Sequence, residues 1–458
     1  MTGKELVLSV LHHQQGPRLP WVPFVGVHAG KIIGKDATAM LTDGDNLYHG
    51  VLEAAKLYQA DGVPIMFDLQ VEAEILGCEL VWAPKGPPSV KTHPLEDSDE
   101  VPCVCKVPSA SDGRLPLILD TMKRVKAAIG DTTALYGLIC GPFTLASHLR
   151  GTNIFMDMYD NEEYIKQLMA FTGAVATAMA QLYIEAGMDV IAVVDPLVSQ
   201  ISPDAFAQFL TEPFTKLFDF IREKGALSSF FVCGNATRNI EEMCKTGPDG
   251  ISVDENVKMV SAKEITDRYN ITLGGNIPLT TVMLHGSQLE NMKCVVDLID
   301  SLTPQNLIIS PGCDMPYDTP VENTIAASQA VHDTAKIRAM VADYQTPADE
   351  YAKIDIQLPD YAALTKPLIE VCTLDSETCA ACTYMMAAAN DIKAAFGDAV
   401  DVVEYKYMYK QDIARFMKMG VAQLPSIYIN GKLAYSSLIP SKADFTEKVN
   451  EAIAELKK

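Results

Sequence analysis

Residues 228–239 read SSFFVCGNATRN, a short apolar run that stops at Cys233 and is followed by Gly-Asn. Runs of this kind alternate with longer stretches of helical periodicity through residues 1–345. Such alternation is typical of βα units around a parallel sheet. The eight predicted strands are residues 22–27, 63–67, 134–139, 190–194, 229–232, 250–253, 271–274 and 307–310.

Eight βα units predict a (β/α)8 TIM barrel, in which chemistry gathers where the strands end and the next loops begin. For each aspartate at these positions, capping of the following helix is the alternative. The residues at the eight strand ends are His28, Asp68, Gly141-Pro142, Asp195, Cys233, Asp254-Glu255, Asn276 and Cys313.

Cys233 and Cys313 end the fifth and the eighth predicted strands. In a closed barrel, residues at one height on different strands point to a common centre. The two thiols therefore suggest a shared metal ion, with zinc as the natural candidate for thiolate ligands. The alternative is a pair of inert buried cysteines, since cysteine is often found inside proteins.

The composition restricts the possible functions. Hydrophobic residues make up 48% of the chain and charged residues 21%, as in a globular protein. A formal charge of −22 argues against nucleic acids and anionic membrane surfaces as partners. The start, MTGKELVLSVLHHQQ, does not resemble a signal peptide, so a cytoplasmic location is expected. The 11 cysteines argue against a secreted disulfide framework and for reduced thiols, metal ligands or redox chemistry.

A second domain follows residue 345. Residues 346–365 are polar and rich in proline, which predicts a linker. Residues 366–458 then follow a thioredoxin-like order, with Cys379-Ala-Ala-Cys382 between a strand and a helix. Cys379 is expected at the helix N-terminus, where thiolate is stabilised. Pro425 matches the cis-proline loop that faces the CxxC in thioredoxin-like proteins. The alternatives are a docking module with an idle CxxC, or a CxxC that binds a metal.

Residues 1–345 resemble the uroporphyrinogen decarboxylase superfamily, and within it the corrinoid:thiol methyltransferases. The resemblance rests on DGVPIMFDLQVEAEILGCELVW, GPFTLASHLRG, EAGMDVIAVVDPLVSQISPDAF, the GGN of LGGNIPL, and SPGCDMPYDTPVEN. It implies a (β/α)8 barrel. Asp68 falls where the decarboxylases place a catalytic aspartate. The arginines that bind carboxylates in the decarboxylases are missing from the matching stretch, residues 27–31, which disfavours a porphyrinogen substrate.

The methyltransferase branch holds zinc with a His-X-Cys after the fifth strand and a Cys after the eighth. Cys233 and Cys313 match the two cysteines, but Phe231 stands at the position of the histidine. The resemblance therefore implies zinc if His28, Asp254 or Glu255 supplies a further ligand; the alternatives are a weakly bound metal or direct use of the two thiols.

The reaction implied by the resemblance moves a methyl group from a methylcobamide to a thiol or similar acceptor. No Asp-X-His-X-X-Gly corrinoid-binding signature is present, so a separate corrinoid protein is expected to carry the cobamide. His28, Asp195 and Asn276 are the expected contacts to the cofactor. Two other functions stay open: a lyase that uses Asp68 on a small substrate, and a thiol-disulfide oxidoreductase. The second domain is expected to reduce a disulfide, either Cys233 with Cys313 or an oxidised acceptor.

Overall fold

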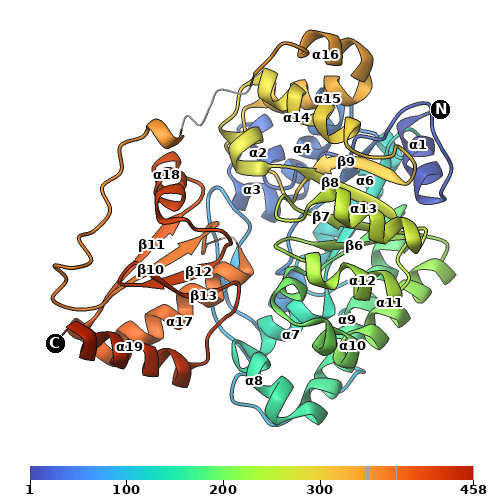
Figure 1. Cartoon of the computed structure of the whole chain (residues 1–458). Coiled ribbons are helices and arrows are strands. Elements are labelled where there is room, and N and C mark those ends of the chain that lie inside the picture. The colour runs from blue at the N-terminus through green and yellow to red at the C-terminus, as the bar shows by residue number, and fades with distance from the viewer. Residues whose placement is uncertain (346–350, 378, 457–458) are drawn as a thin grey trace. The chain divides into compact units, whose positions relative to one another are not determined.

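The computed structural model describes residues 1–345, 351–377 and 379–456 (Figure 1). The chain forms two compact units, Met1–Tyr344 and Gln345–Lys458, which are called here the barrel unit and the thioredoxin unit. Residues 346–350 of the predicted linker lie outside the described residues.

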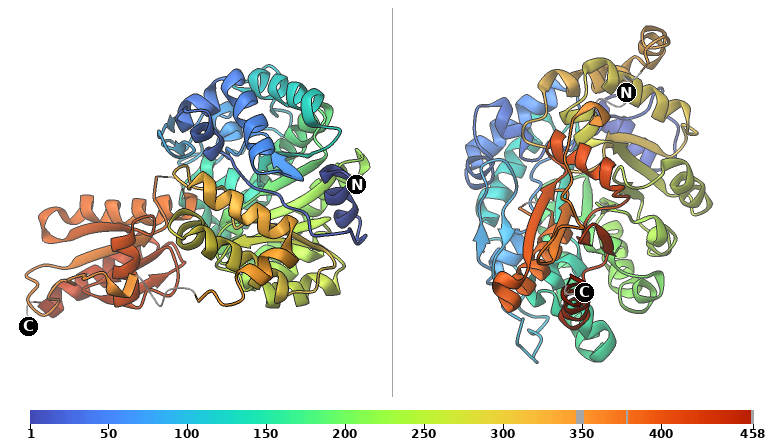
Figure 2. Two further views of the ribbon diagram at one scale, coloured as in Figure 1. Left: turned by 90° about the horizontal axis from the view of Figure 1, so that it is seen from above. Right: turned by 60° about the vertical axis from the view of Figure 1, so that its left-hand side comes forward.

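The barrel unit is built on a curled sheet of seven parallel strands in the order β1-β4-β5-β6-β7-β8-β9 (Figure 2). Each neighbouring pair is parallel, as expected for consecutive βα units. A small antiparallel pair, β2 (Leu80–Val81) with β3 (Ser89–Val90), lies in the loop region after β1. The seven strands are β1 (Gly62–Pro64), β4 (Ala134–Cys140), β5 (Val190–Val194), β6 (Leu227–Val232), β7 (Gly250–Val253), β8 (Thr272–Ile277) and β9 (Leu307–Pro311).

The first of the eight predicted strands, residues 22–27, is not a strand. Only Trp21 makes a parallel bridge, to Ile309 of β9. The Trp21 carbonyl also accepts the Asp61 N–H at 2.9 Å, so this short segment links β9 to the chain just before β1. Pro20 and Pro23 have no N–H to donate to a ladder, which explains why the pairing stops there.

Helices connect the strands and cover the outer face of the curled sheet (Figure 2). Among the described residues, α9 is long and apolar enough to cross a membrane by length and composition, but half of its apolar window is buried and it packs against α7, α11 and β4. The helices are α1 (Gly3–Leu11), α2 (His28–Ile32), α3 (Ala37–Thr42), α4 (Gly44–Leu57), α5 (Val71–Ile75), α6 (Leu115–Ile129), α7 (Pro142–Arg150), α8 (Asn153–Asp160), α9 (Glu162–Glu185), α10 (Pro203–Phe209), α11 (Thr211–Glu223), α12 (Ile240–Lys245), α13 (Met259–Arg268), α14 (Gln288–Asp300), α15 (Val321–His332) and α16 (Thr334–Met340).

The barrel interior is a packed core. Val7, Val10 and Leu11 of α1 join it together with strand residues such as Phe231. The Phe231 ring lies 4.8 Å from the Phe24 ring, centroid to centroid. Cys233 and Cys313 are partly buried and pack against the same cluster. The two cysteines therefore lie on top of an apolar core, which excludes water from one side of them.

The thioredoxin unit has a four-stranded sheet in the order β11-β10-β12-β13. β10 pairs in parallel with β11 and antiparallel with β12, and β12 pairs antiparallel with β13. Asn430 and Gly431 both have positive φ, as the turn between β12 and β13 requires. The elements are β10 (Leu368–Thr373), α17 (Ala380–Phe396), β11 (Asp401–Lys406), α18 (Lys410–Met419), β12 (Ser426–Ile429), β13 (Lys432–Ser436) and α19 (Lys442–Leu456).

Much of the predicted linker belongs to the thioredoxin unit. A short 3-10 turn, Tyr351–Lys353, packs against α18, and Ile356 is buried. Lys418 Nζ donates to the Ile356 carbonyl at 2.5 Å, and Tyr361 Oη donates to Glu370 at 2.9 Å. Ile356 is the buried apolar residue of a stretch whose other apolar residues follow no clear period.

Candidate active site

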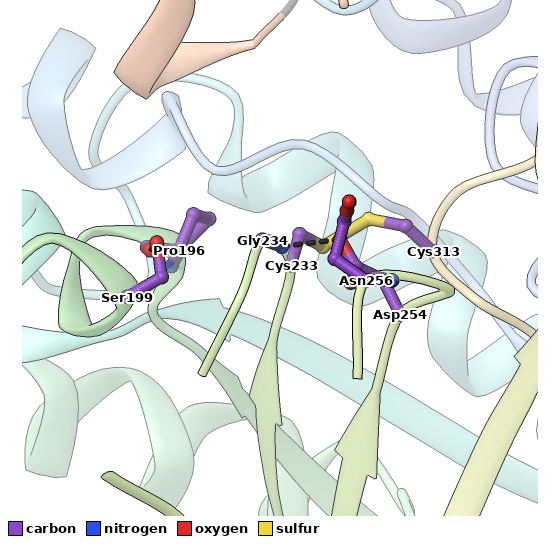
Figure 3. The surroundings of a disulfide bond; sticks show 7 residues. All are labelled: Pro196, Ser199, Cys233, Gly234, Asp254, Asn256 and Cys313. Atoms are coloured by element: carbon purple, nitrogen blue, oxygen red, sulfur yellow. Dashed lines mark hydrogen bonds between the residues drawn. A yellow bond between two sulfur atoms is a disulfide. The ribbon is translucent and has the colours of Figure 1, made fainter. Parts of the chain in front are cut away.

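Cys233 and Cys313 meet at the rim of the barrel and form a disulfide (Figure 3). Cys233 directly follows β6, and Cys313 lies two residues after the end of β9. Their Cα atoms are 6.1 Å apart although the residues are 80 positions apart in sequence. Because β7 and β8 lie between β6 and β9 in the sheet, the bond connects two strands that are not neighbours.

Asp254 and Glu255, which follow β7, each touch the chain beside one of these cysteines. The Asp254 carboxylate accepts the N–H of Gly234, the residue after Cys233, and the N–H of Asn256 at 2.9 Å (Figure 3). Glu255 lies against Gly312, the residue before Cys313, where a Cβ would come within 2.6 Å of Glu255 Oε2. Burial raises the pKa of both carboxyls, that of Glu255 to about 8 with a contribution from the charge of Asp254. Asp254 thus fixes the chain after Cys233, whereas Glu255 Oε1 accepts the Leu279 N–H at 3.2 Å and its Oε2, close to Gly312, has no hydrogen-bond partner among the described residues.

The donor set at this rim does not fit zinc as the sequence suggested. A metal binds thiolates, and both sulfurs are used in the disulfide. Phe231, at the position where the family has histidine, is a fully buried core residue. Within residues 1–345, 351–377 and 379–456, no three His, Cys, Asp or Glu side chains gather in a way that could hold a metal ion. Both Asp254 carboxylate oxygens accept backbone N–H groups, so Asp254 would have to give up one of these bonds to bind a metal.

Asp195 and Asn276 also anchor the backbone. Asp195 is fully buried and accepts from Phe143 N–H at 2.9 Å, Thr144 N–H at 3.0 Å and Thr144 Oγ1 at 2.6 Å. It therefore caps α7 from the end of β5, and burial raises its pKa to about 7. A Cβ at Gly141 would lie 2.3 Å from Asp195 Cβ, so this approach requires glycine. Asn276 Nδ2 donates to the carbonyls of Asp254 and Val257 at 2.7 and 2.8 Å.

His28 does not end a strand and begins α2. It is fully buried, with Nε2 2.6 Å from Tyr58 Oη and Nδ1 3.0 Å from the Tyr317 carbonyl oxygen. Burial lowers its pKa to about 4, so the ring is neutral at pH 7. Both ring nitrogens already have partners in this structure, which accounts for the histidine without a cofactor.

Asp68 belongs to a buried charged cluster behind the rim. Its Oδ2 lies 2.7 Å from Arg114 Nη2, and its side chain is fully shielded from solvent. Arg114 also donates to Glu74 at 2.7 Å and lies over the Trp82 ring, 5.0 Å from its centroid. Glu72 Oε1 accepts the Cys140 N–H at 2.9 Å, and burial raises the Glu72 pKa to about 7.

Sequence reasoning missed Arg114, Glu72 and Glu74. The two glutamates stand in QVEAE, directly after Asp68, and their spacing on a short helix was a usable signal. Arg114 is 46 positions after Asp68, in the loop before α6. Nothing in the surrounding sequence indicates that it pairs with Asp68.

Cys379 and Cys382 of the thioredoxin unit are both free thiols. Cys379 is the N-cap of α17, and its sulfur accepts the Cys382 N–H at 3.4 Å. Cys382 is fully buried, its sulfur accepts the Leu374 N–H at 3.3 Å, and burial raises its pKa well above the usual value. The half-exposed Cys379 is therefore the sulfur that another molecule can reach.

Pro425 lies at the same end of the sheet as the CxxC turn. The Leu424–Pro425 peptide is cis. Pro425 directly precedes β12, where Ser426 pairs with Cys372, and Cys372 stands near the end of β10, from which the chain runs to Cys379. The arrangement agrees with the predicted cis-proline loop.

Glu404 and Lys406 of β11 support the CxxC loop and were not foreseen. Glu404 accepts from Thr373 Oγ1 at 2.6 Å and from Ser376 Oγ at 2.9 Å. Lys406 Nζ lies 2.7 Å from both Asp375 and Glu377, which raises its pKa although burial opposes the charge. These contacts fix the segment that leads into Cys379.

Comparisons with known proteins agree with this geometry. The family model described as uroporphyrinogen decarboxylase matches residues 2–334, and the model described as thioredoxin domain matches residues 368–450. The methylcobamide:CoM methyltransferase MtbA of Methanosarcina acetivorans is 30% identical over 269 residues, covering 57% of this chain and 77% of that protein. The enzyme of the same name from Methanosarcina mazei is 27% identical and covers 70% of this chain and 95% of its own length.

A solved structure shows the same fold. A methyltransferase from Methanosarcina mazei superposes with a TM-score of 0.67 at 24% identity, covering 73% of this chain and 99% of that one. At this identity, the superposition supports the barrel architecture alone. The chain belongs to the uroporphyrinogen decarboxylase family and is a methyltransferase of the branch that includes the methylcobamide:CoM enzymes, with a thioredoxin domain joined after the barrel.

Proposed function

We propose that this methyltransferase takes a methyl group from a methylated corrinoid on a partner protein and transfers it to a small thiol at the barrel rim. The observation that carries the proposal is the meeting of Cys233 and Cys313 at the ends of β6 and β9. The chain has no corrinoid-binding signature of its own, so the corrinoid arrives on another protein. We expect the reaction in the cytoplasm, where thiols are kept reduced.

The group transfer is a displacement at carbon. The acceptor thiol loses its proton and its sulfur attacks the methyl carbon, because thiolate is the nucleophilic form. A carbon–sulfur bond forms as the cobalt–carbon bond breaks, and the electron pair of the broken bond stays on the cobalt of the corrinoid substrate. In this proposal, reduced Cys233 and Cys313 line the place of the acceptor sulfur and orient it toward the methyl group.

The chain's own residues restrict this chemistry. Asp254 holds the backbone beside Cys233, and both cysteines lie within two residues of a strand end, so the thiols stay at the rim after the disulfide opens. The packed core beneath the two cysteines includes Phe231. The acceptor thiol therefore has to approach the cysteines from the mouth of the barrel. Zinc has no step in this proposal, because the residues at the rim do not form a fitting donor set.

The lyase alternative finds less support. Asp68, its expected catalyst, is shielded from solvent and paired with Arg114 at 2.7 Å. Removing one partner of a buried ion pair leaves the other charge unpaired, so Asp68 would have to give up its contact with Arg114 to act on a substrate. The match of Asp68 to the catalytic aspartate of the decarboxylases stays a prediction of the resemblance.

The test is a methyl-transfer assay with reduced full-length protein, a methylated corrinoid protein and a series of small thiols, including coenzyme M. We expect a methyl thioether, detected by mass spectrometry, that forms only when protein, methylated corrinoid and thiol are all present. Methylation of tetrahydrofolate without methylation of any thiol would contradict the thiol acceptor. Decarboxylation of a small acid without corrinoid would contradict the proposal as a whole.

A further inference from the structure

Two cysteine pairs near the expected chemistry differ in oxidation state, and a further disulfide, Cys103–Cys105, lies in the loop before α6. Cys233 and Cys313 share a disulfide, whereas Cys379 and Cys382 are free thiols. A disulfide has no thiol to place beside an acceptor, so methyl transfer as proposed above requires two electrons and two protons at the barrel rim. The two thiols of the CxxC release two electrons and two protons when they are oxidised to a disulfide.

The two sulfurs of the CxxC differ in the way that disulfide reduction requires. Cys379 is partly exposed at the N-terminus of the 17-residue helix α17, where backbone N–H groups stabilise a thiolate. Cys382 is fully buried and retains its proton more strongly, because burial raises its pKa. Cys379 is thus suited to attack an outside disulfide, and Cys382 to release the mixed disulfide afterwards.

The barrel disulfide is suited to be the substrate. Both of its cysteines are only partly buried, so an attacking sulfur can reach them from the mouth of the barrel. Asp254 holds the backbone after Cys233, and the sheet holds the ends of β6 and β9, so the bond can open and close while the strand ends stay in place. The CxxC is part of the same chain as the barrel disulfide. This covalent link raises the effective concentration of the CxxC at the disulfide to about the millimolar range.

We propose that the thioredoxin unit is an internal disulfide reductase for Cys233–Cys313, and that this exchange switches the methyl-transfer site on. The inference rests on the proposed function only in assigning the two barrel thiols to methyl transfer. It also accounts for the poor fit to zinc: in this chain the pair is a reversible disulfide, and Phe231 fills the place of a third ligand.

The exchange balances in two steps. Cys379 thiolate attacks one sulfur of Cys233–Cys313, a Cys379 mixed disulfide forms, and the released barrel sulfur takes up a proton. Cys382 then loses its proton and attacks the Cys379 sulfur, which forms Cys379–Cys382 and releases the second barrel thiol. The barrel pair gains two electrons and two protons, and the CxxC loses them. An external dithiol of the small-molecule or protein class reduces the CxxC again.

The first test traps the intermediate. In full-length Cys382→Ser the mixed disulfide cannot be resolved, so a peptide containing Cys379 should be bonded to a peptide containing Cys233 or Cys313 after oxidation and partial reduction. Mass spectrometry of the digest, on material with monomer mass, identifies the bond. The same crosslink must be missing in the double variant Cys379→Ser/Cys382→Ser. A Cys382→Ser protein without any such crosslink would overturn the proposal.

The second test measures the rate. Full-length protein is oxidised, a limiting dithiol is added, and the free thiols of Cys233 and Cys313 are followed by isotope-coded alkylation. We expect reduction at least about tenfold slower in Cys379→Ser than in wild type, at a rate independent of protein concentration in the wild type. Cys294→Ser, a partly exposed cysteine on α14, is the matched control and should reduce like the wild type.

Either of two results would overturn the inference: equal rates in wild type and Cys379→Ser, or two free thiols at Cys233 and Cys313 in air-oxidised protein. Cys379→Ala is the second variant if Cys379→Ser folds poorly, since serine and alanine differ in their ability to cap α17. The assay reads thiols alone and needs neither corrinoid nor acceptor. Its outcome is therefore independent of whether methyl transfer takes place as proposed.

Discussion

The barrel unit and the thioredoxin unit each contain a pair of cysteines, and the two pairs arise in different ways. Cys233 and Cys313 are 80 residues apart and meet because β6 and β9 end on the same rim. Cys379 and Cys382 are three residues apart, on the first turn of one helix. The first pair exists only when the whole barrel has formed, whereas local geometry sets the second. The barrel pair, which the fold brings together, is therefore suited to a site of fixed geometry for a substrate. The CxxC pair, whose geometry comes from one helical turn, is suited to thiol-disulfide exchange.

The largest expected effect is the loss of methyl transfer when the barrel pair, Cys233 and Cys313, is disrupted. Under reducing conditions, Cys313→Ala should lower the rate of methyl thioether formation about a hundredfold or more, the size expected for a group that contacts the reacting atoms. Cys294→Ala is the control for the loss of a cysteine outside the site. A Cys313→Ala protein with wild-type turnover would mean that the barrel pair is only structural.

A second prediction sharpens the contrast within the CxxC pair. In fully reduced protein, iodoacetamide should alkylate Cys379 at least about tenfold faster than Cys382, because thiolate character and exposure control the rate. Cys382 is fully buried and its pKa is raised, and fully buried Cys372 serves as an unreactive reference. Peptide mass spectrometry over a time course gives both rates. Equal rates would remove the division of labour on which the exchange depends.

A third prediction concerns the third zinc ligand that Cys233 and Cys313 lack. Phe231 lies two residues before Cys233 on β6, so both side chains point to the same face of the strand. After reduction, Phe231→His should raise the affinity for zinc at least about tenfold, because imidazole adds a third ligand to two thiolates. Zinc retained after dialysis is the measurement.

Phe230→His is the matched control for this change. Phe230 is equally buried, but it faces the opposite side of β6, where it stacks on Phe214 with 4.4 Å between the ring centroids. It should gain no zinc. Equal gains in both variants would show that the added imidazole binds zinc without the barrel cysteines.

The sequence contained most of the fold because strand patterns and the CxxC are local signals. The stretch at residues 190–194 is apolar throughout and forms β5 with the same bounds. Residues 22–27 look similar, but Pro23 interrupts the ladder, so only Trp21 pairs. Ile356 likewise is buried although it stands in a stretch with no clear apolar period, so the sequence alone did not assign this stretch to a domain.

The candidate site was less predictable, because its contacts are between residues far apart in the chain. The rim position of Cys233 and Cys313 could be foreseen from barrel geometry, but spacing does not distinguish two zinc ligands from a disulfide. Asp195 was open between a cofactor contact and a cap, and its hydrogen bonds from the Phe143 and Thr144 N–H groups of α7, 51 or more residues away in sequence, could not be foreseen. The pairing of Asp68 with Arg114 has no local signature at all.

The smallest expected effect concerns the stability of the barrel unit behind its rim. Glu72 is 1% exposed, and burial raises its pKa to about 7, above the roughly 4.3 of an unfolded chain. The folded state therefore binds the proton more tightly, and the free energy of unfolding increases as pH falls through about 7, then levels off near the unfolded pKa. Above pH 7 the ionised, buried carboxylate lowers stability.

Glu72→Gln tests this sign directly, because the amide oxygen still accepts the Cys140 N–H while the charge is removed. At pH 8 the barrel transition of the variant should lie a few degrees above that of the wild type, and the two should converge toward pH 5.5. Differential scanning calorimetry between these pH values gives the comparison, with Glu79→Gln, an exposed partner of Lys91, as control. Parallel curves for wild type and Glu72→Gln would mean that Glu72 has the same pKa in the folded and unfolded chain, so that the nearby charge of Arg114 would offset the cost of burying the Glu72 carboxylate.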